Sequence, residues 1–320
     1  MPLLGSLKPK ALRAGSRVGL VSPAGPLLEL DDVVRGEELC RALGYEPVAF
    51  PNAGRKYGYL AGTDDERLAD LNAALADASL DAVWCLRGGY GITRILPHVD
   101  FAAAARRPKV VIGYSDITAL LLALHREAGL VTFHGPMART SLTNFSRWHL
   151  DRVTTSVSAA GRLGRVAPPA DELVPALGRI VAIRGGAAEG PLFGGNLSLL
   201  QCLIGTRWFP DLAGAVLFLE DVGEDLYRVD RMLSHLRTAG ALGRLAGVAI
   251  GRFTEMDRGG EDGALGFDEV LATYLAPLGI PVAHGFPVGH VDDQWTLPVG
   301  VRARLDASAG ELEILEAAVA

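Results

Sequence analysis

Ser115 has the sequence setting of a serine nucleophile. It lies in Gly113-Tyr-Ser-Asp-Ile117, after the apolar run 109–113 and before a helical stretch at 117–128. A strand-to-helix turn exposes a side chain at the carboxyl edge of a parallel sheet, where open α/β folds place their sites. The helix start offers free N–H groups and a positive dipole end to an oxyanion. Ser115 or Asp116 could equally serve as a helix cap, and no G-x-S-x-G elbow is present, so both interpretations stay open.

A glycine pair follows a second apolar strand. Gly88 and Gly89 lie in Arg87-Gly-Gly-Tyr-Gly91, directly after residues 81–86 (DAVWCL). Adjacent glycines let the backbone approach a substrate closely and aim N–H groups at it, although they are equally typical of a tight turn. The segment is not G-x-G-x-x-G, and the chain has no P-loop motif, which disfavours dinucleotide binding and nucleotide hydrolysis.

Glu220 and His290 could supply the two other groups that a serine nucleophile needs. Glu220 ends the apolar strand 215–219, and His290 lies in a loop rich in Gly and Pro. A nucleophile requires a base within hydrogen-bond reach, and the base requires an orienting group. A structural role remains open for each residue, because sequence spacing alone does not bring them together. His134 also follows a strand and could line a site.

Metal and nucleic-acid chemistry have little support in the sequence. The chain has no H-E-x-x-H motif, and its three cysteines, Cys40, Cys85 and Cys202, lack ligand spacing. We therefore expect no metal and interpret the cysteines as reduced core residues. The net charge of −6 and the absence of a basic stripe argue against a nucleic-acid partner. The sequence shows neither a signal-peptide layout nor a run long enough to span a bilayer, so we expect a soluble, cytoplasmic protein.

The elements that must position these residues form an α/β pattern. In the first half, strands and helices alternate, which predicts a mostly parallel sheet covered by helices. Thr63-Asp-Asp-Glu66 is a capping box. We predict an N-terminal domain at 1–145, a linker region at 146–184 and a C-terminal domain at 185–320. The expected strands are 17–22, 81–86, 109–113, 130–133, 215–219, 245–251, 280–283, 301–305 and 311–315, and the expected helices are 30–43, 63–78, 117–128, 148–157, 197–204, 225–236 and 267–274.

Taken together, these segments resemble the LD-carboxypeptidase (muramoyl-tetrapeptide carboxypeptidase) family of serine peptidases, which includes microcin-immunity relatives. The resemblance covers nearly the whole chain in order, and is therefore more specific than any single motif. The matching segments are VSPAGP (21–26), GYLAGTDDERLADL (58–71), RGGYG (87–91), GYSDITALL (113–121), TFHGPM (132–137), GGNLSLL (194–200), LFLEDVGEDLYRVDRML (217–233) and GFPVGH (285–290).

The resemblance implies a Ser–His–Glu triad at Ser115, His290 and Glu220. It also implies an oxyanion hole made by backbone N–H groups near Gly89 and Asp116. Members of the family have a flavodoxin-like N-terminal domain and a smaller C-terminal α/β domain, with the triad divided between them. The implied activity is release of the terminal D-alanine from a murein tetrapeptide by cleavage of an L,D-peptide bond through an acyl-enzyme.

Further expectations follow from the same resemblance. Gly88, Tyr90, His134 and Asn196 lie in the matching segments, and we expect them to contact the substrate. The expected partner is a small muropeptide, with no cofactor, no nucleic acid and no membrane. The family implies a cytoplasmic homodimer that acts in peptidoglycan recycling.

Two regions depart from the family pattern. Val291-Asp292-Asp293 follows His290 where a glycine is expected, and residues 140–184 match poorly. Both regions could shape the substrate pocket. Two alternatives therefore remain: an immunity-type peptidase that acts on peptidyl- or aminoacyl-nucleotides, for which Trp148 could stack on a base, and a non-catalytic two-domain binding protein.

Overall fold

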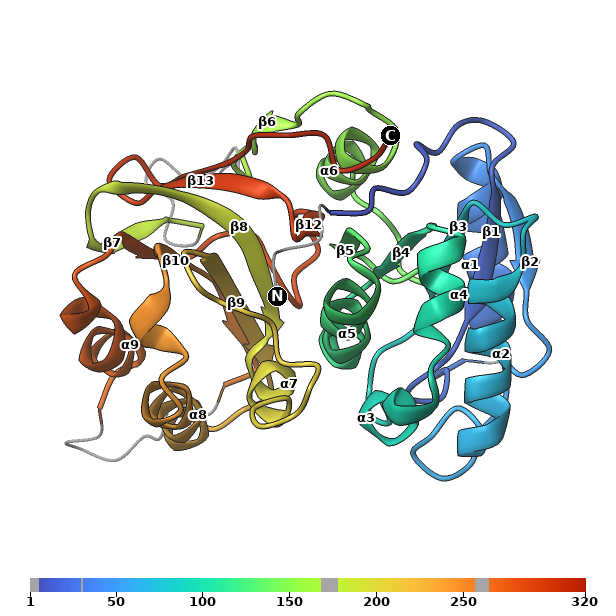
Figure 1. Cartoon of the computed structure of the whole chain (residues 1–320), viewed down its shortest axis with the longest axis horizontal. Coiled ribbons are helices and arrows are strands. Elements are labelled where there is room, and N and C mark those ends of the chain that lie inside the picture. Colours follow the sequence, from blue (N-terminus) through green and yellow to red (C-terminus); the bar gives the residue numbers. More distant parts are fainter. Residues whose placement is uncertain (1–5, 30, 168–177, 257–264) are drawn as a thin grey trace.

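Two β-sheets organise the chain, one built mainly from each half of the sequence (Figure 1). The computed structural model describes residues 6–29, 31–167, 178–256 and 265–320. Both sheets have parallel strands at their centres, with helices interspersed along the chain. This arrangement confirms the predicted α/β fold with a flavodoxin-like first half.

The first sheet has six strands in the order β12-β5-β4-β3-β1-β2. Five of them pair in parallel, in the 2-1-3-4-5 order of flavodoxin-like folds. Parallel strands are covered on both faces, which explains their short continuous apolar sequences. The strands are β1 (Arg17–Val21), β2 (Glu46–Ala49), β3 (Ala82–Cys85), β4 (Val110–Gly113), β5 (Thr132–His134) and β12 (Leu297–Val299).

Helices connect these strands. Thr63 caps its helix as the sequence predicts: its hydroxyl accepts from Glu66 N, and the Glu66 carboxylate accepts from Thr63 N. The apolar helix that follows Ser115 is buried along most of its length and packs against the second half of the chain. The helices are α1 (Asp32–Ala42), α2 (Asp64–Ala76), α3 (Ile92–Ile95), α4 (Phe101–Arg106) and α5 (Thr118–Ala128).

The second sheet has eight strands in the order β6-β14-β13-β8-β9-β10-β11-β7. Its four central strands, β8 to β11, run parallel, and antiparallel strands flank them. The strands are β6 (Gly161–Arg162), β7 (Val181–Arg184), β8 (Ala187–Asn196), β9 (Val216–Val222), β10 (Gly247–Thr254), β11 (Val282–His284), β13 (Arg302–Asp306) and β14 (Glu311–Ile314).

Three helices accompany this sheet: α7 (Leu197–Cys202), α8 (Leu226–Thr238) and α9 (Phe267–Leu275). The apolar face of α8 that its sequence spacing predicts is buried, since Leu226, Val229, Leu233 and Leu236 all lie in the core. No helix in the described ranges is both long and apolar enough to cross a membrane.

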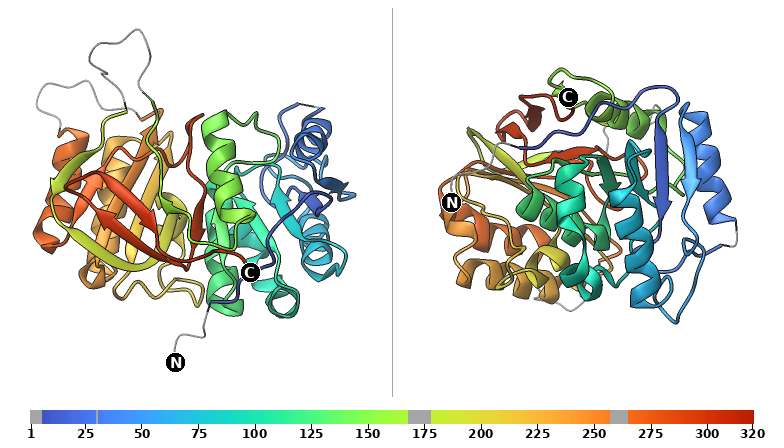
Figure 2. Two further views of the ribbon diagram at one scale, coloured as in Figure 1. Left: turned by 90° about the horizontal axis from the view of Figure 1, so that it is seen from above. Right: turned by 45° about the vertical axis from the view of Figure 1, so that its right-hand side comes forward.

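The two halves interlock through segments that cross between them. β12, far along the chain, pairs antiparallel with β5 at the edge of the first sheet. Helix α6 (Asn144–Thr154) lies between the halves, as the left view of Figure 2 shows. Residues 146–184, expected to link the halves, contribute most of α6 and also β6 and β7. The division into domains at 1–145, 146–184 and 185–320 remains a prediction, because the segment expected to be a linker also supplies regular elements.

The cysteines follow the prediction only in part. All three are free thiols, and Cys40 and Cys85 are buried in the core. Cys202, at the end of α7, is exposed, so the expectation of a core position was wrong there. The short helix α7 buries Leu197 and Leu200 and leaves the Cys202 side of its last turn open to solvent.

Candidate active site

A buried carboxylate and an imidazole meet at the carboxyl end of β9. Glu220 Oε2 lies 2.8 Å from His290 Nδ1, although the residues are far apart in sequence. The Glu220 side chain is fully buried, whereas that of His290 is 20% exposed. Gly289 makes this approach possible, because a Cβ there would lie 2.5 Å from Glu220 Oε2. The pair leaves the far edge of the imidazole available for a second partner.

The electrostatics of this pair depend on the imidazole. Burial raises the pKa of Glu220, and the hydrogen bond from His290 acts in the opposite direction. Glu220 Oε1 has no hydrogen-bond partner within the described part of the chain. An ionised Glu220 would therefore draw its stabilisation chiefly from its hydrogen bond with His290.

Ser115 lies one residue from a ring that packs on His290. The Tyr114 and His290 ring centroids are 4.7 Å apart, with the planes tilted by 59°. Ser115 begins a short 3₁₀ turn between β4 and α5 and has φ of 59°. A positive φ is uncommon for a residue with a Cβ, and such strain clusters at functional sites. In the described residues the Ser115 hydroxyl has no hydrogen bond; such contacts often tighten only when substrate binds.

The glycine pair lies against Ser115. A Cβ on Gly88 would lie 2.9 Å from Ser115 Cβ and 3.1 Å from its Oγ. The Gly88 carbonyl accepts a 2.8 Å hydrogen bond from Gly25 N. Because a trans peptide unit is planar, the Gly89 N–H must point away from Gly25. This contact joins the loops after β1 and β3, the point where the strand order reverses and ligands bind in such sheets.

Asp116 connects the glycine loop to the turn that carries Ser115. Its Oδ2 accepts a 2.9 Å hydrogen bond from Ile92 N, just beyond the glycine loop. Burial raises the pKa of Asp116 to about 6, against the effect of that hydrogen bond. The Asp116 backbone N–H belongs to the first turn of a helix, where amides have no intrahelical acceptor. The side chain thus holds together the two segments expected to form the oxyanion hole.

Asn196 lies beside Glu220, and its backbone N–H and both polar atoms of its side chain make hydrogen bonds within the protein. It is the register partner of Glu220 between β8 and β9 and is 3% exposed. Its N–H donates to Thr118 Oγ1 at 3.1 Å, and its side-chain amide donates to Asp221 Oδ1 at 2.8 Å. Its Oδ1 accepts from Leu199 N. The expected substrate contact would therefore compete with intramolecular partners.

The other expected contacts differ in access. Tyr90 is 48% exposed, and its ring lies 5.8 Å from that of Tyr59. His134 is fully buried behind Tyr114 and Phe218, and neither ring nitrogen has a partner in the described structure. Burial, and then the proximity of His290, lower the pKa of His134 to about 3. His134 is thus a neutral core residue here, and a direct substrate contact would require its side chain to move.

Two positioning residues had no signal in the sequence. Ser146 of α6 donates its hydroxyl to Asp292 O at 2.7 Å and accepts from Gln294 N at 2.9 Å. It thereby fixes the loop after His290, the segment that departs from the family pattern. The Asp221 carboxylate accepts hydrogen bonds of 2.8 to 3.0 Å from Asn196 and Ser198. Only its place next to Glu220 could have drawn attention to it.

The described residues contain no group of three or more His, Cys, Asp or Glu side chains placed to hold a metal ion. The chemistry that the arrangement does offer is that of a hydroxyl, an imidazole and a buried carboxylate beside two loops with free amides.

Two models of known protein families match the chain. Residues 18–135 match the LD-carboxypeptidase N-terminal domain, and residues 189–305 match the LD-carboxypeptidase C-terminal domain. The chain belongs to the LD-carboxypeptidase family. The predicted resemblance is therefore confirmed, as is the prediction of a serine-type carboxypeptidase.

Several members of the LD-carboxypeptidase family are similar along their whole length. The "Probable murein peptide carboxypeptidase" of Bacillus subtilis is 37% identical, over 98% of this chain and 95% of that protein. The murein tetrapeptide carboxypeptidase of Pseudomonas aeruginosa is 35% identical, over 91% and 94%.

Solved structures in the same family share the fold. Muramoyltetrapeptide carboxypeptidase from Oxalobacter formigenes has a TM-score of 0.81 and 33% identity, over 94% of this chain and 99% of that one. The microcin C7 self-immunity protein MccF, in complex with aspartyl sulfamoyl adenosine, has a TM-score of 0.85 and 25% identity, over 98% and 100%.

Proposed function

We propose that this LD-carboxypeptidase hydrolyses the L,D-peptide bond of a murein tetrapeptide and releases its terminal D-alanine. Ser115 would be the nucleophile, His290 the general base and Glu220 the residue that orients the base. The proposal rests on one observation above others: the buried Glu220 carboxylate holds His290 Nδ1 at 2.8 Å, and the His290 ring packs on the neighbour of Ser115.

The first half of the reaction forms an ester. Ser115 Oγ attacks the carbonyl carbon of the bond before D-alanine, and its proton passes to His290 Nε2. The carbonyl oxygen becomes an oxyanion, for which the Gly89 and Asp116 amides are the proposed donors. His290 then gives the proton to the departing nitrogen, the carbon–nitrogen bond breaks, and D-alanine leaves.

The second half releases the shortened peptide. The oxygen of a water molecule attacks the ester carbonyl while His290 takes a proton from that water. The same two amides are the proposed donors to the second oxyanion. The carbon–Oγ bond breaks, and the proton returns through His290 to Ser115. Glu220 holds the tautomer of His290 in both halves and stabilises its charged form. Ser115 is regenerated, so one water is consumed for each D-alanine released.

The test combines turnover with covalent labelling. Purified protein is incubated with a murein tetrapeptide, and free D-alanine is quantified; Ser115→Ala is expected to release none while unfolding at the same denaturant concentration. A serine-directed phosphonate should modify only the peptide that contains residue 115, as read by mass spectrometry. D-alanine release by Ser115→Ala at the wild-type rate would refute the assignment.

Solved structures of MccF support a second substrate class, because they include complexes with aspartyl sulfamoyl adenosine and with glutamyl sulfamoyl guanosine. Trp148 is 49% exposed, as a stacking residue would need to be, but the guanidinium of Arg152 already lies 4.2 Å from its ring centroid. The identity to the murein relatives, 35–37%, favours the peptide. Assaying an aminoacyl-adenylate mimic beside the tetrapeptide separates the two, and a preference for the mimic would reassign the substrate.

A non-catalytic binding protein is the remaining alternative. It predicts tight peptide binding with no D-alanine release and no labelling of Ser115. The combined assay therefore distinguishes all three functions in one preparation.

A further inference from the structure

A buried arginine contacts the far end of the glycine loop (residues 87–91). Arg67 lies on α2, and its side chain is fully buried. Its Nη1 donates to Gly91 O at 3.0 Å and also to Pro23 O, and its Nη2 donates to Asp64 Oδ1. Taking a charge out of water is costly unless hydrogen bonds and opposite charges compensate for it. Two of the groups that compensate here are backbone carbonyls near the glycine pair.

These two carbonyls lie on the two loops that meet at the glycine pair. Gly91 comes two residues after Gly89, in the loop that follows β3. Pro23 comes two residues before Gly25, in the loop that follows β1. The loops touch there, since a Cβ on Gly25 would lie 3.2 Å from Gly89 Cα. A single nitrogen of Arg67 therefore joins both loops close to their contact.

The peptide group between Gly91 and Ile92 lies between two opposite charges. Its carbonyl oxygen accepts from Arg67 Nη1 at 3.0 Å, and its N–H donates to Asp116 Oδ2 at 2.9 Å. Burial raises the pKa of Asp116, and the Ile92 hydrogen bond and the charge of Arg67 act against that effect. Hydrogen bonds to charged groups are stronger than those between neutral groups, so this peptide group is held firmly on both sides.

Asp116 extends this arrangement to the proposed nucleophile. It follows Ser115 directly, and its backbone N–H is one proposed donor to the oxyanion, while the Gly89 N–H is the other. The two donors belong to different segments, and an oxyanion needs both in place before it forms, at about 2.7–3.1 Å from the charged oxygen. The contacts from Arg67 through the 91–92 peptide to Asp116 join these segments.

We propose that Arg67 is a positioning residue, which holds the glycine loop where the Gly89 and Asp116 amides can bind one oxyanion. The inference rests on the proposed function, because it concerns the oxyanion of that reaction. Arg67 is fully buried, so it acts through the loop and not on the substrate directly. Its loss should weaken stabilisation of the transition state and leave binding of the intact peptide nearly unchanged.

The rate at which a serine-directed phosphonate modifies Ser115 tests this role without depending on the choice of peptide. The oxygen on phosphorus is expected to use the same two amides. Arg67→Met keeps most of the side-chain volume and removes the charge and the donors. We expect its labelling rate, and its kcat and kcat/KM for D-alanine release, each to fall by about 10²-fold. The Kd for the tetrapeptide, measured calorimetrically in the Ser115→Ala protein, should not change.

Two further variants separate positioning from stability. Arg67→Lys keeps the charge without the planar fork and should recover part of both rates. Asp64→Asn tests the same link from the surface, and remains available if Arg67→Met does not fold. Asp64 pairs with Arg67 on one side and with the exposed Arg94 on the other. Asp64→Asn should lower the labelling rate about fivefold, the factor that one hydrogen bond of typical strength represents, whereas Arg94→Gln should leave the rate unchanged.

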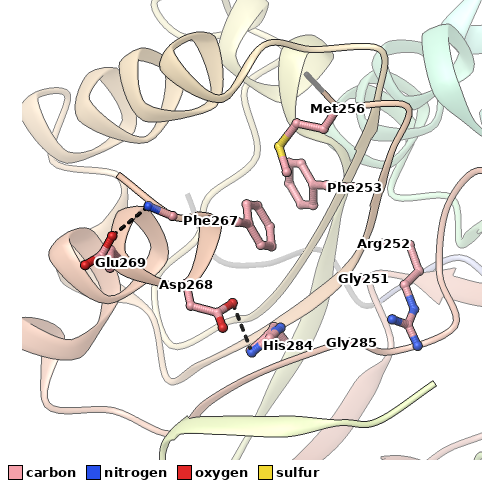
Figure 3. Close-up of a pocket in the computed structure, with 10 residues that line it drawn as sticks. Gly251, Arg252, Phe253, Met256, Phe267, Asp268, Glu269, His284 and Gly285 are labelled. Atoms are coloured by element: carbon pink, nitrogen blue, oxygen red, sulfur yellow. Dashed lines mark hydrogen bonds and ion pairs between the residues drawn. The ribbon is translucent and has the colours of Figure 1, made fainter. Parts of the chain in front are cut away.

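Arg252→Gln is the control for removing a partly buried guanidinium elsewhere. Arg252 lines a cavity of about 430 Å³ at the carboxyl ends of β10 and β11, where Asp268 and His284 pair at 3.6 Å (Figure 3). None of the described residues that line this cavity belongs to the proposed triad or to the glycine loop. Both rates should therefore stay at the unmodified values, and an equal fall in Arg252→Gln would overturn the inference.

The inference is also overturned if the folded variants of Arg67 and Asp64 are labelled as fast as the unmodified protein, or if the unmodified protein is not labelled. A lower midpoint of urea unfolding with unchanged rates would mean that Arg67 only stabilises the fold. D-alanine release by the unmodified protein is measured separately. Its absence would refute the proposed function, while the labelling rates would still decide the role of Arg67.

Discussion

Thr118 and Asn196 join the two halves of the molecule beside the proposed triad. The Thr118 hydroxyl oxygen accepts a 3.1 Å hydrogen bond from the Asn196 backbone N–H, and both groups are buried. Thr118 begins the helix that follows Ser115, and Asn196 is the register partner of Glu220. One hydrogen bond therefore links the segment of the proposed nucleophile to the strand pair that carries Glu220, the proposed orienting carboxylate.

Replacing Thr118 by valine should weaken that link. The substitution keeps the shape of the side chain but leaves the buried Asn196 N–H without its acceptor, which costs about 1–3 kcal/mol of folding free energy. We expect a lower midpoint of urea unfolding and a fall in kcat that exceeds any rise in KM. Thr118→Ser retains the hydroxyl and should recover most of both quantities. Equal behaviour of the two variants would show that the hydroxyl does not contribute.

A methyl group at Gly88 should impair turnover more than stability. The added Cβ would lie 2.9 Å from Ser115 Cβ, so the Ser115 turn or the glycine loop must shift. Misplacement of a reacting group by about 1 Å can cost about 10²-fold in rate. We expect kcat for D-alanine release to fall by that order. Gly243→Ala is the control, because nothing lies within 4 Å of a Cβ there; unchanged kcat in Gly88→Ala would argue against the close approach.

Replacing Glu220 by glutamine should separate its charge from its size. The amide can still contact His290, but it can hold the wrong tautomer and no longer stabilises the charged imidazole. A comparable change in a serine–histidine–aspartate triad lowers kcat by about 10⁴-fold, and we expect a loss of that order. Glu189→Gln is the control, since Glu189 of β8 forms an exposed ion pair with Arg302 of β13. A loss below tenfold in Glu220→Gln would remove Glu220 from the proposed mechanism.

The sequence predicted the elements whose signals are local. Continuous apolar runs located β1, β3 and β4, and the Thr63 capping box located the start of α2. It missed β12, because a three-residue strand that joins a sheet built by the other half of the chain has no local periodicity. It also missed β8, whose glycines and small residues resemble a loop although they lie between β9 and β13.

The candidate site also combines residues that local sequence signals predict with contacts that only the tertiary structure reveals. Strand ends and glycines drew attention to Ser115, Gly88 and Glu220, but only tertiary structure brings Glu220 to His290. His134 followed a strand as a site residue would, yet it is buried, because its strand lies between β4 and β12.

Asp116 should make stability depend on pH in a defined direction. Burial raises the pKa of its carboxyl from an ordinary 3.8 to about 6 in the folded protein. Between these values the folded state binds more protons than the unfolded state, so the contribution of Asp116 to stability falls as pH rises. The loss is complete above about pH 6 and amounts to about 3 kcal/mol, at about 1.4 kcal/mol per pKa unit.

Asp116→Asn should remove this penalty, because an amide does not ionise and its oxygen can still accept from Ile92 N. Urea unfolding of both proteins is measured from pH 4 to pH 8, and the difference in free energy of unfolding is taken at each pH. We expect the free energy of unfolding of the variant to increase relative to that of the unmodified protein as the pH rises from about 4 to about 6. Above that range the difference between the two proteins should be constant. The comparison cancels every other titrating group that the two proteins share. A difference that stays constant across the range would mean that Asp116 ionises as easily in the folded chain as in the unfolded one.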